Sequence, residues 1–474
     1  MNLRRIICVV LTGFVVACGP DSASIATDAL SPTRSVLLFT IDTLRADHLS
    51  AYGYEKHSTP ATDQFALQSL VFERAYSQAT QTNPACTSML TGLVPPRHGV
   101  FTQGNAVRDE VVTLAAMLSS QGFITGTFSA NLCRLQDVSG SVFQEGWTHL
   151  FCGMNDEKPQ RTWGRDVVDA GMRWMAEQQS EKRPFFAWIH LMDPHGEWDP
   201  GAEQWDHAAD PLRSKTNQTR HYSQFESEQV FPPAEELARL NALYDAEVRG
   251  SDALFAEVLT FIETLPDSGE IAVILSADHG EELYDSWSRL GHGASMTEGV
   301  LHVPLMVRAT GVSPGRSDAF VETLAITPTI LDLLGADSPY SLDARSLLEG
   351  VPELPFARSY AWPPVVSLRS ENERVWVRGS PEPPEPRHEV PWRVEVPWYQ
   401  FIECIAWYEP NAPTLPIWVA PESLSANGLG ARLLDAARRV AGDMEGGTAE
   451  LSEITDPAYL EQLIQLGYIE GSAH

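Results

Sequence analysis

Basic side chains are scarce in this sequence. Its 474 residues include 33 Lys and Arg against 63 Asp and Glu, which gives a formal net charge of -30. Because a nucleic-acid backbone is bound by clustered Lys and Arg, this balance argues against nucleic acid as a partner. A small anionic ester would need local positive charge, and a bound cation is the simplest source of it.

Cysteines are also few. Two of the six lie in the N-terminal leader described below, and the others are Cys86, Cys133, Cys152 and Cys404. Their spacing does not resemble a zinc ribbon. Outside the cytoplasm a disulfide is permitted, and Cys133 and Cys152 are the nearer pair in the sequence, so a disulfide between these two is the pairing we expect.

Long apolar runs are absent beyond the N-terminal leader. Two arginines precede the apolar stretch from Ile6 to Ala17, which is too short to span a bilayer and fits an export signal. It ends in Val-Val-Ala-Cys, which resembles the lipobox of bacterial lipoproteins. We therefore expect a lipoprotein signal peptide over 1–17, lipidation of Cys18 and a small-residue tether over 18–33. The alternative is an ordinary signal peptide that is cut elsewhere.

This leader sets the expected location. The protein would lie in the bacterial cell envelope, facing the periplasm or at the outer membrane. Because no other segment is long and apolar enough to cross a bilayer, the membrane would be contacted only through the lipid anchor.

The rest of the composition is that of a globular protein. Hydrophobic residues make up 43% of the chain, which is enough to bury a substantial core. From Ser35 to about Leu334, apolar strand-like runs alternate with helical patterns, which predicts an α/β fold with a doubly wound, mostly parallel sheet flanked by helices. The clearest helix runs from Leu237 to Ile262, where apolar residues recur near helical spacing, and Pro266 closes it.

Two regions depart from this alternation. The stretch from Trp198 to Phe231 is polar with scattered aromatics, and we expect a surface insertion there. Beyond Gly335 the pattern predicts a smaller α+β subdomain over 341–474. Its expected elements are a hairpin of Val365–Arg369 with Arg374–Arg378, an extended proline-rich loop over 380–386, and helices over about 429–441 and 457–466.

Three short polar patches directly follow apolar, strand-like runs. The run 36–41 ends in Asp42, the run 185–189 leads into His190, Asp193 and His195, and the run 271–275 leads into Asp278, His279, Gly280 and Glu281. Such runs are typical of buried strands, and ligands of open α/β sheets bind beyond the carboxyl ends of these strands. We therefore expect distant parts of the chain to meet at one metal-binding crevice.

A hydroxyl residue stands at the start of a predicted helix between the first two patches. The segment from Thr82 to Gly92 ends in a helix-stopping glycine, and Pro84 suits the first helical position, so Thr82 lies at or just before the helix N-terminus. Free backbone N–H groups and the positive end of the helix dipole favour an alkoxide and an incoming anion there. Thr82 is therefore either a nucleophile or a simple N-cap, for which threonine is well suited.

Taken together, these segments resemble the sulfatase family of the alkaline-phosphatase-like superfamily. The matching segments occur in the same order as in that family and extend over about residues 34–335. The resemblance is carried by Ile41–Gly53, Thr82–Gly92, Pro95–Val100, Asp193–His195, Ser276–Glu281, Gly291–Gly293, Glu298 and Val303–Leu305. It implies an alkaline-phosphatase-like catalytic domain over 34–340.

The resemblance also implies a set of site residues. One divalent metal ion would be held by Asp42, Thr82, Asp278 and His279, with Thr82 as the nucleophile. His195 and His292 would bind the transferred oxyanion or protonate the leaving oxygen, work that suits a side chain whose pKa lies near neutrality. An imidazole ligand favours zinc or manganese over calcium as the ion.

Other residues of these segments have structural or open interpretations. Arg45 and Asp47 are interpreted as a structural ion pair. His190 points either toward the crevice or into the sheet, and Asp193 either orients His195 or binds the metal ion.

The chain departs from the family pattern at positions that carry its chemistry. A sulfatase has Cys or Ser, oxidised to formylglycine, at the nucleophile position and Arg four residues later. Here these residues are Thr82 and Cys86, and Cys86 is interpreted as a packed side chain. The second acidic ligand expected after Asp42 is Thr43. The Lys and His usual after the strand that contains Phe128 are also missing.

These features predict a one-metal hydrolase of sulfate or phosphate esters that acts on a small-molecule, glycan or lipid ester. A plain threonine nucleophile also resembles nucleotide phosphodiesterases and phosphoethanolamine or phosphoglycerol transferases. A phosphodiesterase or phosphotransferase acting on phosphorus is therefore one alternative. A non-catalytic, sulfatase-like binding lipoprotein is the other.

Overall fold

The computed structural model describes most of the chain before residue 350 and the strands of a second sheet after it. The described residues are 33–56, 58–130, 144–153, 163–196, 198, 224–225, 232–285, 290–293, 296–349, 357–361, 365–369, 374–380, 401–408 and 417–418. The predicted signal peptide, Cys18 and the tether up to residue 32 lie outside these ranges, so lipidation stays a prediction. Within the described ranges, every helix is too short or too polar to cross a bilayer.

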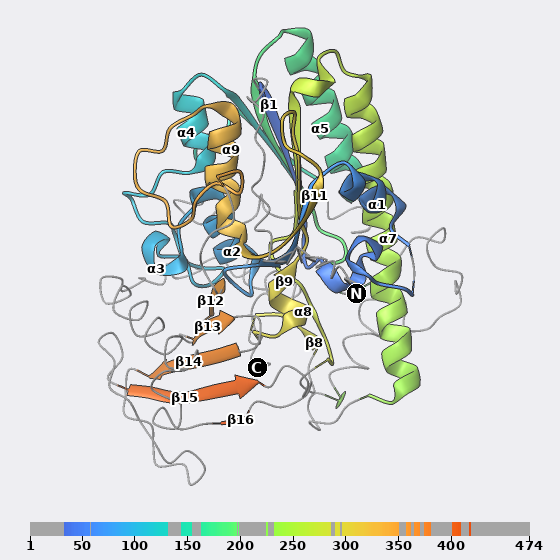
Figure 1. The fold of residues 1–474 in the computed structure, drawn as a ribbon, viewed down its shortest axis with the longest axis vertical. Helices are drawn as coiled ribbons and strands as arrows, with labels where there is room; N and C mark the ends of the chain where they lie inside the picture. Colours follow the sequence, from blue (N-terminus) through green and yellow to red (C-terminus); the bar gives the residue numbers. More distant parts are fainter. Residues whose placement is uncertain are drawn as a thin grey trace, which may run out of the picture.

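A nine-stranded sheet forms the centre of the molecule (Figure 1). Its strands are β1 (Ser35–Ile41), β2 (Leu70–Tyr76), β3 (Ile124–Ser129), β4 (His149–Cys152), β5 (Phe185–Leu191), β6 (Ile271–Ser276), β9 (His302–Val303), β10 (Leu305–Arg308) and β11 (Gly315–Glu322). They lie in the order β11-β2-β10-β6-β1-β5-β3-β4, and β9 pairs with β2. Only β9 and β10 pair antiparallel with their neighbours. The other pairs are parallel, which confirms the predicted mostly parallel sheet.

Helices cover both faces of this sheet, as Figure 1 shows. One face carries α1 (Pro60–Leu67), α5 (Trp163–Ser180) and α7 (Ala234–Thr264), and the other carries α2 (Thr82–Thr91), α3 (Pro95–His98), α4 (Leu114–Ser120) and α9 (Ile326–Leu334). The predicted long helix is thus confirmed as α7. Short elements complete this part of the chain: η1 (Ala46–His48), η2 (Ser50–Tyr52), η6 (Ser268–Glu270), η7 (Thr323–Ala325), α8 (Glu298–Leu301), β7 (Glu282–Leu283) and β8 (Leu290–Gly291).

The central strand β1 shows why its sequence is continuously apolar. Successive side chains of a strand point to opposite faces. Leu37 and Phe39 pack into the cluster beneath α5 and α7, whereas Val36 and Leu38 pack into the cluster beneath α2 and α9. All four side chains are fully buried. The two-sided cover therefore accounts for the run of apolar residues.

Helix α2 begins slightly earlier than the sequence suggested. Its first residue is Thr82 and the capping position is Gln81, so Pro84 is the third helical residue rather than the first. Proline is tolerated there because the first four N–H groups of a helix have no partner within the helix. The predicted stop is confirmed, since Gly92 has a φ of 69°, in the left-handed region that favours glycine.

The predicted surface insertion is wrong at its first residue. Trp198 is 2% exposed, its indole N–H donates to the Pro194 carbonyl oxygen at 2.6 Å, and its ring packs edge-on against Tyr244 of α7. A large aromatic ring with a satisfied N–H is stable in the core, and this tertiary packing leaves no periodic signal in the sequence. Most of the stretch that follows lies outside the described residues.

A second, antiparallel sheet follows the nine-stranded sheet along the chain (Figure 1). Its strands lie in chain order: β12 (Ala357–Ala361), β13 (Val365–Arg369), β14 (Arg374–Ser380), β15 (Phe401–Tyr408) and β16 (Ile417–Trp418). The predicted hairpin is confirmed as β13 and β14, although β14 continues to Ser380. The proline-rich residues 381–386 and the helices expected over 429–441 and 457–466 lie outside the described residues.

The described cysteines differ in state. Cys152 is disulfide-bonded, and Cys133 lies outside the described residues, so their pairing stays a prediction. Cys86 is free and fully buried in α2, which confirms that its side chain is packed.

His98 fixes the turn that follows α2. Its Nδ1 accepts the Val100 backbone N–H at 3.1 Å, so Nε2 carries the proton and donates to Ser88 Oγ at 2.9 Å. Burial, aided by the charge of Arg108, lowers the pKa of His98 to about 3. The folded protein therefore holds this imidazole neutral.

We predict that His98 makes the fold sensitive to acid. In the unfolded chain its pKa is about 6.5, so as pH falls below that value the unfolded state takes up a proton that the folded state refuses. The free energy of unfolding should therefore decrease between about pH 7.5 and about pH 5, and His98→Gln should lessen this decrease. Urea unfolding at the two pH values measures it. Equal pH slopes in both proteins would contradict this role.

Candidate active site and metal centre

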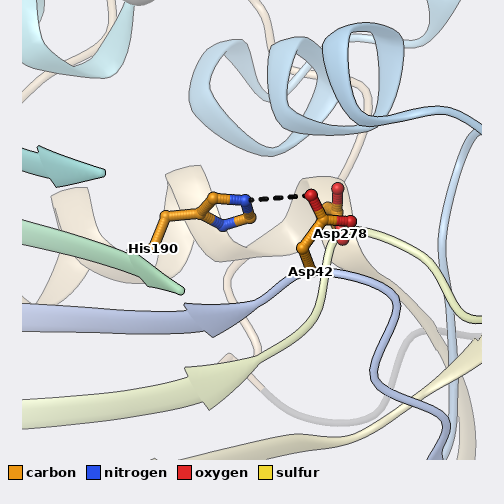
Figure 2. A group of neighbouring side chains, drawn as sticks. All are labelled: Asp42, His190 and Asp278. Carbon is orange, nitrogen blue, oxygen red and sulfur yellow. Dashed lines mark ion pairs between the residues drawn. The ribbon is translucent and has the colours of Figure 1, made fainter. Parts of the chain in front are cut away.

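Three buried side chains meet beyond the carboxyl ends of the central strands. Asp42 follows β1, Asp278 follows β6, and His190 lies near the end of β5 (Figure 2). All three are 0% exposed, and one ligand atom from each lies within 4.8 Å of the others. The parallel pairing of β1 with both β5 and β6 brings them together.

His279 connects this group to the predicted nucleophile. Its Nε2 lies 3.5 Å from Asp278 Oδ2, 3.9 Å from Asp42 Oδ1 and 3.4 Å from Thr82 Oγ1. Its Nδ1 lies 2.9 Å from the Gly280 carbonyl oxygen. Because a carbonyl only accepts, Nδ1 carries the proton when the ring is neutral, and Nε2 is left with a free lone pair toward the crevice. The four side chains named from the sequence thus lie in one place.

The electrostatics of this group suit a cation. Burial opposes ionisation of Asp278, but His279, His190 and two backbone N–H groups lower its pKa. Those N–H groups belong to His279, at 2.8 Å, and to Thr43, at 3.3 Å. Burial likewise opposes the charged form of His279, yet Asp278 and Asp42 raise its pKa. Within the described part of the chain, neither Asp278 Oδ2 nor His190 Nε2 has a hydrogen-bond partner. Since buried charge without compensation is costly, these residues fit a divalent cation.

His190 faces the crevice, which resolves the alternative left open by the sequence. Its Nε2 lies 3.7 Å from Asp42 Oδ2, and its Nδ1 lies 2.7 Å from Thr40 Oγ1. Thr40 Oγ1 also accepts the indole N–H of Trp188 at 2.8 Å. Burial lowers the pKa of His190 to about 4, so this ring is neutral near pH 7. The orientation depends on the pairing register of Thr40 with His190, for which the sequence carries no signal.

The two remaining predicted histidines gather beside His279. The ring centroids of His195 and His292 are 5.0 Å apart, and those of His279 and His292 are 4.5 Å apart. His195 Nδ1 lies 2.8 Å from the Gly196 carbonyl oxygen, and burial lowers the pKa of this ring to about 3. Nδ1 of His195 therefore faces a main-chain carbonyl oxygen.

Glu281 belongs to this cluster, although the sequence analysis assigned it no role. Its Oε1 lies 2.8 Å from His292 Nδ1, and the side chain is 2% exposed. Burial raises the pKa of Glu281 to about 7, against the opposing charges of His195 and His279. A carboxylate at Nδ1 favours the tautomer of His292 with the proton on Nδ1 and a lone pair on Nε2. The signal in the sequence that could have identified Glu281 was its position three residues after Asp278, in the segment Ala-Asp-His-Gly-Glu.

Arg45 braces the two loops that carry the carboxylates. The predicted pair with Asp47 is confirmed, with Nη2 2.8 Å from Asp47 Oδ2. The same guanidinium donates to the Glu281 carbonyl oxygen at 3.1 Å and pairs with Asp285. A Cβ at Gly280 would lie 2.0 Å from the Gly299 carbonyl oxygen and 3.1 Å from Arg45 Cγ, so only glycine fits between them. The contacts of Arg45 therefore connect the loop after Asp42 to the loop after Asp278.

Two departures from the family pattern have clear structural settings. Thr43 has a φ of 56°, which is strained for a β-branched residue, and its Oγ1 has no hydrogen-bond partner among the described residues. Its backbone N–H reaches Asp278 Oδ1 instead. Burial, together with the charges of Asp278 and Asp42, raises the pKa of Cys86 well above its usual value. Cys86 is therefore a neutral thiol and a poor nucleophile.

Comparisons with known proteins show similarity in sequence and in fold. Arylsulfatase A of Bos taurus is 26% identical over 361 residues, which cover 69% of this chain and 70% of that protein. The fold is similar to that of a protein solved in complex with its substrate D-glucosamine-2-N,6-O-disulfate, with a TM-score of 0.67, 14% identity and coverage of 89% of this chain and 100% of the other. It is also similar to phosphonate monoester hydrolase from Silicibacter pomeroyi, with a TM-score of 0.65, 17% identity and coverage of 89% and 97%.

The family itself is shown by the sequence. A profile named Sulfatase matches residues 34–336, which is more than half of the chain and nearly all of the predicted catalytic domain. The structural neighbours add the expected alkaline-phosphatase-like fold. This chain therefore belongs to the sulfatase family of metal-dependent ester hydrolases.

Proposed function

We propose that this protein hydrolyses sulfate or phosphate esters with Thr82 as its nucleophile. The observation that carries the proposal is the position of Thr82 Oγ1, at the first residue of α2 and 3.4 Å from His279 Nε2. The positive end of the α2 dipole stabilises negative charge on a hydroxyl oxygen at this position. The N-cap of α2 is Gln81, so Thr82 does not have the capping role that the sequence left open.

Asp42, Asp278, His279 and Thr82 would hold one divalent cation. When bound, it supplies positive charge that lowers the pKa of the hydroxyl and offsets the charge of the ester. Two carboxylates with an imidazole suit zinc or manganese better than calcium. His190 lies close enough to contribute a further nitrogen ligand or to orient Asp42.

The chain's own residues account for the proton movements. Thr82 Oγ bonds to the sulfur or phosphorus atom while the bond to the leaving oxygen breaks, and the hydroxyl proton passes to the lone pair of His292 Nε2. His292 gives the leaving oxygen a proton from Nε2, and Glu281 stabilises the protonated ring from its Nδ1 side. Water then attacks the sulfur or phosphorus atom of the covalent intermediate and restores the Thr82 hydroxyl, with a nearby histidine taking the surplus proton.

Comparisons and residues support two candidate substrate classes. A structural neighbour binds a sulfated glucosamine, which supports a small sugar or glycan ester. A second candidate is an ester of phosphorus, because Thr82 stands at the position where a sulfatase has a residue oxidised to formylglycine. The similarity to a phosphonate monoester hydrolase supports this candidate.

Cation binding should depend on both buried carboxylates. After chelation, added zinc or manganese should raise the melting temperature of the wild type, since binding at 100 times Kd stabilises a protein by about 2.7 kcal/mol. Asp42→Asn and Asp278→Asn should lose this rise. Asp169→Asn is the matched control, because the Asp169 side chain is 41% exposed on α5 and pairs with Arg165 only at 3.9 Å. Differential scanning fluorimetry and metal analysis measure the effect, and a full rise in both site variants would rule out this cation site.

Turnover should require the Thr82 hydroxyl. Screening aryl sulfates, phosphate monoesters, diesters and phosphonates should identify a substrate that the wild type hydrolyses. Thr82→Ala should then lower kcat by about 10³-fold or more, whereas Thr82→Ser should keep measurable activity. Equal activity of Thr82→Ala and the wild type would move the chemistry to another residue. A lack of turnover with a fully loaded cation site would instead support the non-catalytic alternative.

Glu281 should matter most for poor leaving groups. Glu281→Gln keeps the size of the side chain but removes the charge that stabilises protonated His292. For an alkyl ester, kcat/KM should fall by about 10²-fold, whereas a 4-nitrophenyl ester, whose leaving group needs no proton, should lose far less. Steady-state kinetics on the two esters measure this difference. Equal losses on both would show that Glu281 is only structural.

A further inference from the structure

A buried amide side chain lies at the N-terminus of α2 beside the nucleophile. Gln103 Oε1 accepts the backbone N–H of Asn83, the second residue of α2, at 3.0 Å. The Asn83 side chain in turn holds the Gln103 loop, because its Nδ2 donates to three backbone carbonyl oxygens. These are Thr102 at 3.3 Å, Gln103 at 3.0 Å and Asn105 at 3.2 Å. The loop and the first turn of the helix are thus fixed to each other.

This contact decides which way the Gln103 amide points. The oxygen and nitrogen of a glutamine amide are often interchangeable in a structure. Here they are not, because a backbone N–H can only donate and so requires Oε1 opposite Asn83. The donor Nε2 is therefore fixed on the other arm of the amide. It shares the amide with an oxygen that already touches the N-terminal turn of α2.

Gln103 Nε2 has no acceptor among the described residues, although the side chain is only 2% exposed. A buried donor without an acceptor destabilises a fold unless a ligand or a water supplies the missing oxygen. The asymmetry within one amide is informative, since its acceptor end is satisfied and its donor end is not. The donor end of this amide thus lacks only an acceptor oxygen.

The local charge makes such a donor useful. The position one turn into α2 holds the neutral thiol of Cys86, and the end of β3 holds Ser129 and Ala130. Neither position supplies a cationic side chain to an oxyanion. The Asn83 N–H is bonded to Gln103, so this second backbone N–H of α2 cannot itself bind an oxyanion. The Gln103 side chain covers that backbone amide and carries a second N–H donor, Nε2, on the same amide group.

We propose that Gln103 Nε2 binds an oxygen of the sulfuryl or phosphoryl group that is transferred to Thr82. Gln103 is then an oxyanion-binding residue that extends the N-terminus of α2 into the site. A neutral amide with a fixed direction stabilises the transferred oxyanion without adding charge. A role of Gln103 in catalysis rests on the proposed function, but binding of an anion by Gln103 can be tested without it.

The sharpest test is Gln103→Glu in the full-length, cation-loaded protein. The carboxylate keeps an oxygen for the Asn83 N–H, so the fold should persist, but it replaces the donor with a negative oxygen. The affinity for inorganic sulfate and phosphate, measured by isothermal titration calorimetry, should fall by about 100-fold, and kcat/KM should fall by about 10² to 10³-fold. Gln103→Met, which is uncharged and of similar length, should weaken anion binding by about tenfold.

Gln121→Glu is the matched control. Gln121 Oε1 also accepts a backbone N–H, from Asp337 at 2.9 Å, but its Nε2 already donates to the Met117 carbonyl oxygen at 3.0 Å. This variant should bind both anions with wild-type affinity. If Gln103→Glu folds and also keeps wild-type affinity, the inference is wrong. If Gln103→Glu does not fold, unchanged anion affinity in Gln103→Met decides against it.

Failure of the proposed function would look different. If the wild type binds sulfate or phosphate through Gln103 but hydrolyses no ester, the oxyanion site stands and the hydrolase proposal fails. If Thr82→Ala abolishes turnover while Gln103→Glu changes neither anion affinity nor kcat/KM, the hydrolase proposal stands and the role of Gln103 fails. Absence of saturable anion binding in the loaded wild type would overturn the oxyanion site.

Discussion

The repulsion between two buried carboxylates is the constraint on which the rest of this structure depends. Asp42 and Asp278 are both 0% exposed and lie at the carboxyl ends of adjacent parallel strands. A ligand oxygen of one carboxylate lies within 4.8 Å of a ligand oxygen of the other. Two buried negative charges this close are stable only with positive charge between them. A protonated His279 imidazole meets that need, and a bound cation would meet it in the same way. The same positive charge is what an oxyanion ester requires, so stability and chemistry call for the same feature.

The surrounding loops keep this arrangement in place. Tyr244 of α7 donates its hydroxyl to the Thr43 carbonyl oxygen at 2.7 Å and accepts the Arg45 backbone N–H at 3.0 Å. Arg45 then reaches across to the loop that carries Asp278. Long-range contacts of this kind hold ligand atoms in position before any ligand binds, which reduces the reorganisation needed on binding. The strained φ of Thr43 is tolerated because both neighbouring contacts hold the loop.

Much of the fold could be predicted from the sequence, because burial on both faces leaves a direct record in it. The runs at β1, β5 and β6 are continuously apolar since helices cover both sides of the sheet. Apolar residues recur at helical spacing in α7 because one side of this helix is buried. Trp198 was misassigned for the opposite reason, since its burial against Tyr244 joins residues far apart in the chain. Contacts of that kind leave no local pattern.

The candidate site divides in the same way. The sequence by itself determined that Asp42, Thr82, Asp278 and His279 stand at strand ends or at a helix start, because those positions follow from local patterns of apolar and helix-starting residues. Only the tertiary structure decided that His190 faces Asp42, that Glu281 holds His292 and that the Gln103 amide reaches α2. These contacts depend on strand register and on how loops close. Register and loop closure are set by packing across the whole domain, which no short stretch of sequence contains.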